Sequence, residues 1–321
     1  MTLPLRFLFA FGWILAGLAV GPVIAQGADS ADAELAIQGE YDSSADAKEH
    51  HAAQVIALGD KKFEVVHYYG GLPGAGWKRG DKREKAQGEL KDGVVTFKHD
   101  AWTAEIKDGK LTAKDKDGKV LATLARVERK SPTMGAKAPE GATVFFDGSN
   151  TEGWNNGKLI EGMLLGATNC STKKQLGDHT LHIEFRTPFM PKARGQGRGN
   201  SGVYIQGRYE CQVLDSFGLE GENNECGGIY TVAKPIVNMC LPPTTWQTYD
   251  MEFTAAKYDA AGKKTTPARV TIKHNGVLIH DNIELKGTPG YKPEGPAPES
   301  LFLQNHGDAV AFRNIWVVEK K

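Results

Sequence analysis

The chain has 321 residues, with 39 basic and 39 acidic side chains and a formal net charge of zero. This length provides one large domain or two smaller ones, each with its own core, and excludes a small fold held together only by disulfides. Because the chain has neither a basic excess nor a basic stripe, nothing indicates a nucleic-acid partner. The 38 glycines and the short apolar runs favour many turns between short strands.

Residues 1–25 have the pattern of a secretory signal peptide. The apolar stretch 3–20 contains Arg6 as its only charge, and small or apolar residues precede the polar region that follows. Pro4 and Pro22 shorten the run below a comfortable membrane span of ~20 residues, which disfavours an uncleaved anchor helix. We therefore expect a secreted or periplasmic protein, with no membrane span in the mature chain.

The cysteines become informative in such an oxidising compartment, where thiols form structural disulfides. They form no Cys-x-x-Cys pair, so zinc and thioredoxin-type chemistry are poorly supported. The favoured pair is Cys226 with Cys240, because each lies in loop-like sequence beside glycine or proline. A catalytic thiol is the weaker alternative. The four candidates for disulfide formation are Cys170, Cys211, Cys226 and Cys240.

A first domain is expected over residues 48–130, after a tether at 26–47 that is rich in Ala, Asp and Ser. Its short alternating segments are separated by Asp-Gly turns, which predicts a small β-meander. A glycine-rich loop at 70–77 lacks the Gly-Lys-Ser/Thr ending of a phosphate-binding loop, so no nucleotide site is expected. No residue pattern assigns a role to this domain.

A linker rich in proline and glycine, residues 131–141, precedes a second domain at 142–321. Strand-like runs follow one another here, and Asn275-Gly276 is a strong hairpin signal. No segment with helical periodicity is longer than a few turns. The fold expected from these patterns is an antiparallel β-sandwich, so the whole chain is predicted to be all-β.

One strand face of the second domain is unusually polar. Alternation places apolar residues on one side of the segment 203–213 and polar ones on the other. A solvated outer face would show the same alternation, but Arg, Glu, Gln and Tyr together suit contacts with sugar hydroxyls. The polar set is Tyr204, Gln206, Arg208, Glu210 and Gln212.

The segment from Glu210 to Asp215 is similar in spacing to the Glu-x-Asp-x-x-Glu motif of sandwich glycosidases such as laminarinases. Gln212 occupies the place of the middle acid, which disfavours an ordinary retaining mechanism. Direct hydrolysis through two carboxylates is a further alternative, in which Glu184 or Glu225 would be the partner of Glu210. An alternative interpretation of Asp215 is that it caps a turn.

Five sequence blocks occur in order in the second domain: Phe145–Ser149 with Trp154, Asn200–Gly202, Gly207–Asp215, Gln304–Gly307 and Phe312–Trp316. Together they resemble the 3-keto-disaccharide hydrolase domain family over about residues 142–319. This resemblance implies a concanavalin-like jelly-roll β-sandwich, in agreement with the strand pattern. Segments like the first domain precede this domain in secreted planctomycete-type proteins, with no activity attached to them.

The resemblance implies cleavage of a glycoside whose sugar carries a ketone at carbon 3. The ketone acidifies the neighbouring C–H bond, so a base can remove the proton, the anomeric group leaves by elimination, and water then adds. Glu210 and His306 are the candidate catalytic residues for proton transfer, and Arg208 and Gln212 are candidates for holding oxygens. The other substrate-binding candidates are Tyr204, Asp215, Gln304 and Arg313.

The sequence leaves alternatives open for both the cofactor and the class of function. A divalent metal ion could stabilise the enolate in place of an arginine, although no ligand spacing marks a site for it. His306 could be only a turn residue, and Arg313 a structural arginine. The expected partner is a carbohydrate, a 3-keto-glycoside. The alternative to the enzyme is a non-catalytic carbohydrate-binding or adhesion protein, because this type of sandwich hosts both classes.

Overall fold

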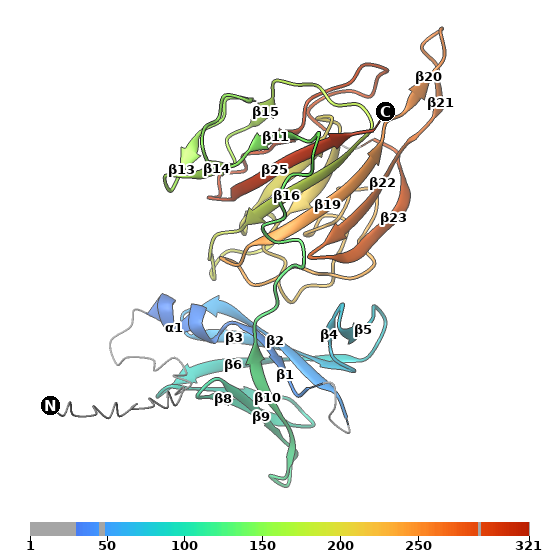
Figure 1. The fold of residues 1–321 in the computed structure, drawn as a ribbon. Coiled ribbons are helices and arrows are strands. Elements are labelled where there is room, and N and C mark those ends of the chain that lie inside the picture. The colour runs from blue at the N-terminus through green and yellow to red at the C-terminus, as the bar shows by residue number, and fades with distance from the viewer. Residues whose placement is uncertain (1–29, 45–48, 288–289, 321) are drawn as a thin grey trace, which may run out of the picture.

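The computed structural model describes residues 30–44, 49–287 and 290–320. The expected signal peptide lies outside these residues. Nearly all regular structure is β, as predicted, and it forms a closed barrel followed by a two-sheet sandwich (Figure 1). No helix in the described ranges is long and apolar enough to cross a membrane.

The first domain is a barrel of eight strands in the order β1-β10-β9-β8-β7-β6-β3-β2. Consecutive strands are mostly neighbours, so the expected meander is present, and β1 closes it by pairing with both β2 and β10. A short β4–β5 pair, Leu72–Pro73 and Gly76–Trp77, lies beside it. The barrel strands are β1 Gly39–Asp42, β2 His51–Gly59, β3 Lys62–Tyr69, β6 Arg83–Lys91, β7 Val94–Lys98, β8 Thr103–Lys107, β9 Lys110–Lys114 and β10 Val120–Val127.

The interpretation of residues 26–47 as a tether is wrong for the part that the structure describes. Helix α1 (Ser30–Ile37) and strand β1 are built into the barrel. The Glu34 carboxylate accepts a hydrogen bond from the Lys61 amide at 2.7 Å, and the Gln38 side chain accepts one from the Ala57 amide at 3.0 Å. These hydrogen bonds attach the segment to the barrel, although its sequence lacks apolar periodicity.

The second domain is a sandwich of two antiparallel sheets, as predicted. The large sheet contains β11 Thr143–Phe146, β13 Leu159–Ile160, β14 Leu164–Gly166, β16 His179–Arg186, β19 Gln247–Thr254, β22 Ala268–His274, β23 Val277–Leu285 and β25 Ala311–Glu319. The small sheet contains β12 Trp154–Asn155, β15 Cys170–Thr172, β24 Phe302–Leu303, β17 Ser201–Ile205 and β18 Tyr209–Val213. Outside both lie η1 Gly195–Gly197 and the pair β20 Lys257–Tyr258 and β21 Lys264–Thr266.

The hairpin predicted at Asn275-Gly276 joins β22 to β23. Both residues have positive φ angles, 51° and 80°, as the favoured two-residue hairpin turn requires. The apolar residues of the two sheets meet between them in one core, which includes Phe185, Val203 and Tyr249.

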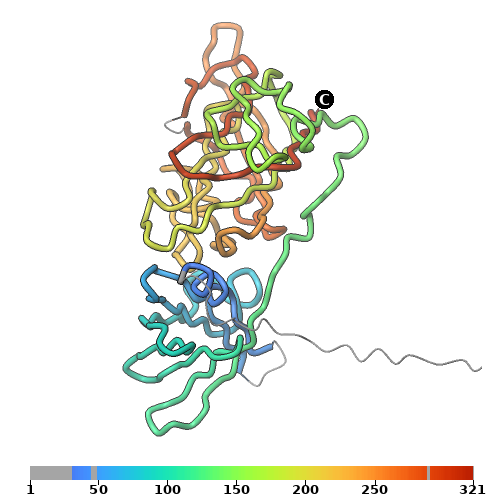
Figure 2. Tube along the Cα trace, turned by 90° about the vertical axis from the view of Figure 1, so that its left-hand side faces the viewer, coloured from blue at the N-terminus to red at the C-terminus, as the bar shows by residue number. Residues whose placement is uncertain are grey.

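The segment between the domains rises from the barrel along one side of the sandwich (Figures 1 and 2). It docks on the outer face of the large sheet through its polar groups. Ser131 Oγ lies 2.6 Å from Thr248 Oγ1, and the Thr133 hydroxyl donates to Asp250 Oδ2 at 2.6 Å. The first part of the linker, residues 131–136, is thus packed against the sandwich.

The side of the barrel formed by β2 and β3 packs against one end of the sandwich. Ile56 and Val66 join the sandwich core. Arg79 donates to the carbonyls of Gly221 and Pro235 at 2.8 and 2.9 Å, and Arg83 pairs with Glu220. The barrel therefore contacts the segment that follows β18.

The predicted disulfides are wrong, because all four cysteines are buried free thiols. Cys170 and Cys211 lie in the same row of the small sheet, separated by Leu303 and Val203 in register. Three strand spacings of about 4.8 Å are too long for a disulfide. Cys226 contacts both the Cys240 thiol and, at 3.2 Å, the Tyr249 hydroxyl, so here burial and hydrogen bonding hold the thiols.

Candidate functional site around Glu210

The outer face of the small sheet carries the candidate site. In the register of β17 and β18, Tyr204 pairs with Glu210 and Gly202 with Gln212, so these four residues share one face. The other face presents Val203 and other apolar side chains to the core. Even the polar face is buried, however, and Glu210 is only 4% exposed.

Burial raises the pKa of Glu210 to about 7, and a hydrogen bond from Tyr204 offsets this only in part. The Tyr204 hydroxyl in turn accepts a hydrogen bond from Gln304 Nε2 at 3.0 Å. Gln304, Tyr204 and Glu210 thus form a chain in which each polar group orients the next. A carboxyl group with a pKa near 7 can both accept and donate a proton at neutral pH.

Gly202 makes room for this carboxylate. A Cβ atom at this position would clash with Glu210 Oε1 and with the Tyr204 ring. The Asn-Ser-Gly block of the sequence therefore contains a glycine that the side chain of Glu210 requires.

An aromatic pair lies next to the chain of polar groups. Phe302 pairs with Tyr204 in register, and their rings meet edge to face at 5.4 Å. Tyr291 stacks on Phe302 with the ring centroids 4.6 Å apart and is 64% exposed. An exposed aromatic ring beside a polar cluster is suited to stacking on a sugar ring. No sequence pattern indicated Tyr291, because it lies outside every predicted strand.

The structure places His306 in an exposed turn that follows Gln304. This turn is joined to the site by its backbone, since the Gln304 amide donates to the Gly202 carbonyl at 3.0 Å. His306 therefore lies at the edge of the site, two residues after Gln304, the first member of the hydrogen-bonded chain that ends at Glu210.

Gln212 is buried beside Glu210. Its Nε2 donates to Gln196 Oε1 at 3.1 Å, while its Oε1 has no hydrogen-bond partner among the described residues. Asn200 Oδ1 is also buried and unpaired within the described ranges. Such acceptors normally bind an ordered water or a ligand donor.

Two other candidates are committed to structural contacts. Arg208 donates to the carbonyls of Pro293 and Ala297 at 2.8 and 3.1 Å. Asp215 is buried in an ion pair of 2.7 Å with Arg198. Arg208 thus anchors the segment before β24, and Asp215 lies toward the barrel. Neither side chain is free to bind a substrate.

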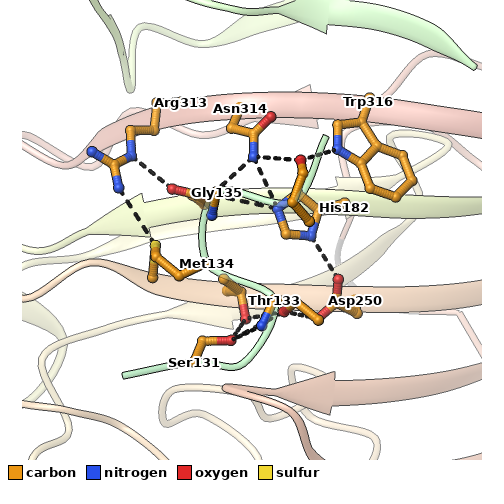
Figure 3. Close-up of polar contacts among 12 residues, drawn as sticks. Ser131, Thr133, Met134, Gly135, His182, Asp250, Arg313, Asn314 and Trp316 are labelled. Carbon is orange, nitrogen blue, oxygen red and sulfur yellow. Dashed lines mark hydrogen bonds and ion pairs between the residues drawn. The ribbon is translucent and has the colours of Figure 1, made fainter. Parts of the chain in front are cut away.

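Arg313 lies on β25, in the opposite sheet from Glu210. Figure 3 shows Arg313 near Met134 of the linker. It pairs with Glu184 Oε2 at 2.7 Å and stacks over the Trp246 ring at 4.0 Å. Arg313 therefore has a structural role, which was the alternative to its assignment as a substrate-binding residue. The sequence alone could not show which sheet would contain β25.

The residues around Glu210 do not fit a resident metal ion. No group of three or more His, Cys, Asp or Glu side chains that could hold a metal occurs in the part of the chain that the structure describes. The neighbours of Glu210 are a tyrosine and two glutamines, so the site offers one carboxylate, whereas a tightly held divalent cation is bound by several charged or imidazole ligands. We derive no catalytic step through a metal.

Comparisons with known proteins agree with the architecture. The model of the 3-keto-alpha-glucoside-1,2-lyase-like domain family matches residues 141–318. A crystal structure of a proposed glycosyl hydrolase from Parabacteroides distasonis is 30% identical, with a TM-score of 0.53, over 57% of this chain and 85% of that chain.

Two further structures of proposed glycosyl hydrolases from the same organism match at 18% and 20% identity, with TM-scores of 0.42 and 0.41. They cover 57% and 56% of this chain and 95% and 99% of their own chains. No curated protein matches the chain. From the family match over more than half of its length, the chain belongs to the 3-keto-alpha-glucoside-1,2-lyase-like domain family.

Proposed function

We propose that the sandwich cleaves 3-keto-glycosides by elimination and hydration, with Glu210 as the base. The observation that carries this proposal is the buried Glu210 carboxyl group, whose pKa is raised to about 7. At that pKa a large fraction is deprotonated at neutral pH, and burial keeps the carboxylate a stronger base than one exposed to water.

In the first step, the Glu210 carboxylate takes the proton from carbon 2, next to the ketone. The C–H electrons form a C1–C2 double bond as the C1–O bond breaks, and the leaving group takes a proton. Water then adds across the double bond, with its oxygen on carbon 1 and a proton on carbon 2. The sum is a hydrolysis, and no oxidant or reductant is consumed.

Tyr204 and Gln304 hold Glu210 in position, and Tyr291 supplies a surface for the sugar ring. His306 is the candidate donor of the proton to the leaving group, because its exposed turn continues from Gln304. We further propose an extracytoplasmic location, which the N-terminal sequence alone supports.

Direct hydrolysis by two carboxylates has less support. Glu184 lies in the other sheet, bonded to Arg313. The Glu225 carboxylate accepts hydrogen bonds from the amides of Gly221 and Glu222 at 2.6 and 3.0 Å. Neither acid is free to assist Glu210.

The test measures release of 3-keto-glucose from an aryl 3-keto-glucoside and of glucose from the matching unoxidised glucoside. We expect release from the keto substrate only, with loss of release in Glu210→Gln. The matched control is Glu252→Gln, which changes an exposed acid of the large sheet. Equal cleavage of both glycosides would overturn the elimination mechanism. Binding of the keto sugar without any release would favour the carbohydrate-binding alternative.

A further inference from the structure

The barrel contains a cavity that the proposed chemistry does not use. Its volume is about 200 Å³, and it lies between β2, β3, β8, β9 and β10. A barrel of eight strands is just wide enough to be filled by side chains or to hold one small ligand. The composition of the wall decides between these two outcomes.

Small side chains keep part of this barrel open. The cavity is lined by alanines at positions 53, 104, 113 and 122, together with apolar residues such as Val65 and Leu111. Elsewhere in the same interior, large side chains such as Phe63 and Phe97 fill the space. The space is therefore confined to one part of the barrel. Exposed Leu121 and Glu49 belong to its lining, so it reaches the surface there.

Aromatic rings form one wall of the cavity. His67 lies 4.4 Å from the Tyr69 ring and 6.0 Å from the Trp102 ring, both measured between centroids. Tyr69 and Trp102 donate their polar hydrogens to Glu84 Oε2, at 3.0 and 2.8 Å. With these donors satisfied, the rings present mainly aromatic surface to the cavity.

The polar end of the cavity presents acceptors. His51 Nδ1 lies 3.0 Å from His67 Nε2, so one hydrogen is shared between the two rings. Burial, together with the neighbouring His51, lowers the pKa of His67 to about 4, so His67 is neutral at pH 7. His67 Nδ1 lies 3.9 Å from the partly buried Glu84 Oε2, which favours hydrogen on this nitrogen and leaves His67 Nε2 to accept from His51 Nδ1. His51 Nε2 is then an acceptor, 3.4 Å from the largely exposed Glu49 carboxylate. This end suits a neutral donor and repels an anion.

We propose that this cavity is a binding site for a small neutral aromatic molecule with a hydroxyl group, a ligand of the phenol class. The ring would lie among the alanines and the aromatic wall, and the hydroxyl would donate to His51 Nε2. The size is suitable, because a cavity of about 150 Å³ in another protein binds benzene. The site is separate from Glu210 and does not depend on the proposed function.

Isothermal titration calorimetry on the full chain tests the proposal with three probes: phenol, toluene and benzoate. We expect one phenol per chain, bound about tenfold or more tightly than toluene, which lacks the donor, or benzoate, which is an anion. Absence of phenol binding at millimolar concentration, or equal affinity for phenol and toluene, would overturn the proposal.

Two variants locate the site. Ala104→Leu fills the cavity and is expected to weaken phenol binding at least tenfold, whereas Ala125→Leu on the outer face of β10 leaves it unchanged. Equal affinity in these two variants would place the phenol elsewhere.

A third variant tests the acceptor. His51→Leu is expected to bind toluene and to lose the preference for phenol, a result that does not require Ala104→Leu to fold. A retained preference would contradict the role of His51.

Discussion

The two sheets of the sandwich each bury a glutamate on a polar face, with opposite consequences. Burial raises the pKa of Glu210 to about 7, offset only in part by Tyr204. Burial of Glu184 acts in the same direction, but hydrogen bonds from His182, Asn314, the Gly135 amide and Arg313 outweigh it and lower the pKa to about 2.

The linker, which covers the polar face of the large sheet, causes the difference between the two pKa values. The linker supplies the Gly135 amide to Glu184 and the Ala136 carbonyl to Asn314 and Trp316, so the network of the large sheet is closed (Figure 3). Beside Glu210, by contrast, Gln212 Oε1 is buried without a partner among the described residues. A saturated carboxylate with a lowered pKa stabilises the fold, whereas a buried carboxyl group with a raised pKa is suited to proton transfer.

The largest expected effect concerns activity. Glu210→Gln removes the base and is expected to reduce kcat/KM for a 3-keto-glucoside by about 10²- to 10⁴-fold. Initial rates of 3-keto-glucose release measure it. A variant that keeps more than half of the wild-type rate would show that Glu210 is not the base.

Replacing the other glutamate is expected to affect folding. Glu184→Leu leaves Arg313 and several buried donors without their acceptor, which costs about 3–5 kcal/mol in the free energy of unfolding. Urea denaturation at pH 7 measures this loss. Unchanged stability would mean that the closed network contributes nothing, and the comparison of the two faces would fail.

The stability of the wild type is expected to fall as the pH rises through the range in which Glu210 titrates, and Glu210→Gln is expected to remove this fall. In the wild type, folded Glu210 keeps its proton up to about pH 7, while the unfolded chain loses it near 4.5. The stability contributed by this group therefore falls as the pH rises from about 4.5 to 7, by about 3 kcal/mol. The variant lacks this fall and should be more stable than the wild type at pH 8. Parallel pH curves from thermal unfolding would contradict the raised pKa.

A smaller effect is expected for Tyr204→Phe. The variant removes the hydroxyl that stabilises the Glu210 carboxylate, so the pKa should rise further. The rising limb of kcat/KM against pH should move up by about one pH unit, because one hydrogen bond to a charged group contributes about 1.5 kcal/mol. An equal loss of rate at every pH would instead indicate a defect in substrate binding.

The smallest effect is expected in the linker. Thr133→Val removes the hydrogen bond to Asp250, at a cost of about 1 kcal/mol, and leaves Glu210 untouched. The midpoint of urea denaturation should decrease while kcat/KM stays unchanged. A large loss of activity would show that the two faces are coupled.

Much of the fold could be predicted from the sequence. Alternation and turn residues indicated the strands of both domains, because each pattern is local. Closure of the barrel by β1 and the position of the linker were not predicted, since both depend on contacts between distant segments. The predicted Cys226–Cys240 disulfide is absent although the two thiols are in contact, because both are buried free thiols held by hydrogen bonds that the sequence does not show.

The candidate site was predicted only in part. Glu210, Tyr204, Gln212 and Gln304 were named as candidates, and the structure brings them together on one face. Arg313 was named with them on the basis of the family resemblance, but it lies in the other sheet. Alternation tells which residues share a strand face, but not which sheet the strand joins or how many donors will surround a buried carboxylate.

We propose that cleavage begins with removal of the proton on carbon 2 of a 3-keto sugar. The most direct test compares kcat/KM for a 3-keto-glucoside with that for the same compound deuterated at carbon 2. The account predicts a primary isotope effect, because the C–H bond breaks before or together with departure of the leaving group. Only a small secondary effect, as expected for direct hydrolysis at carbon 1, would contradict it.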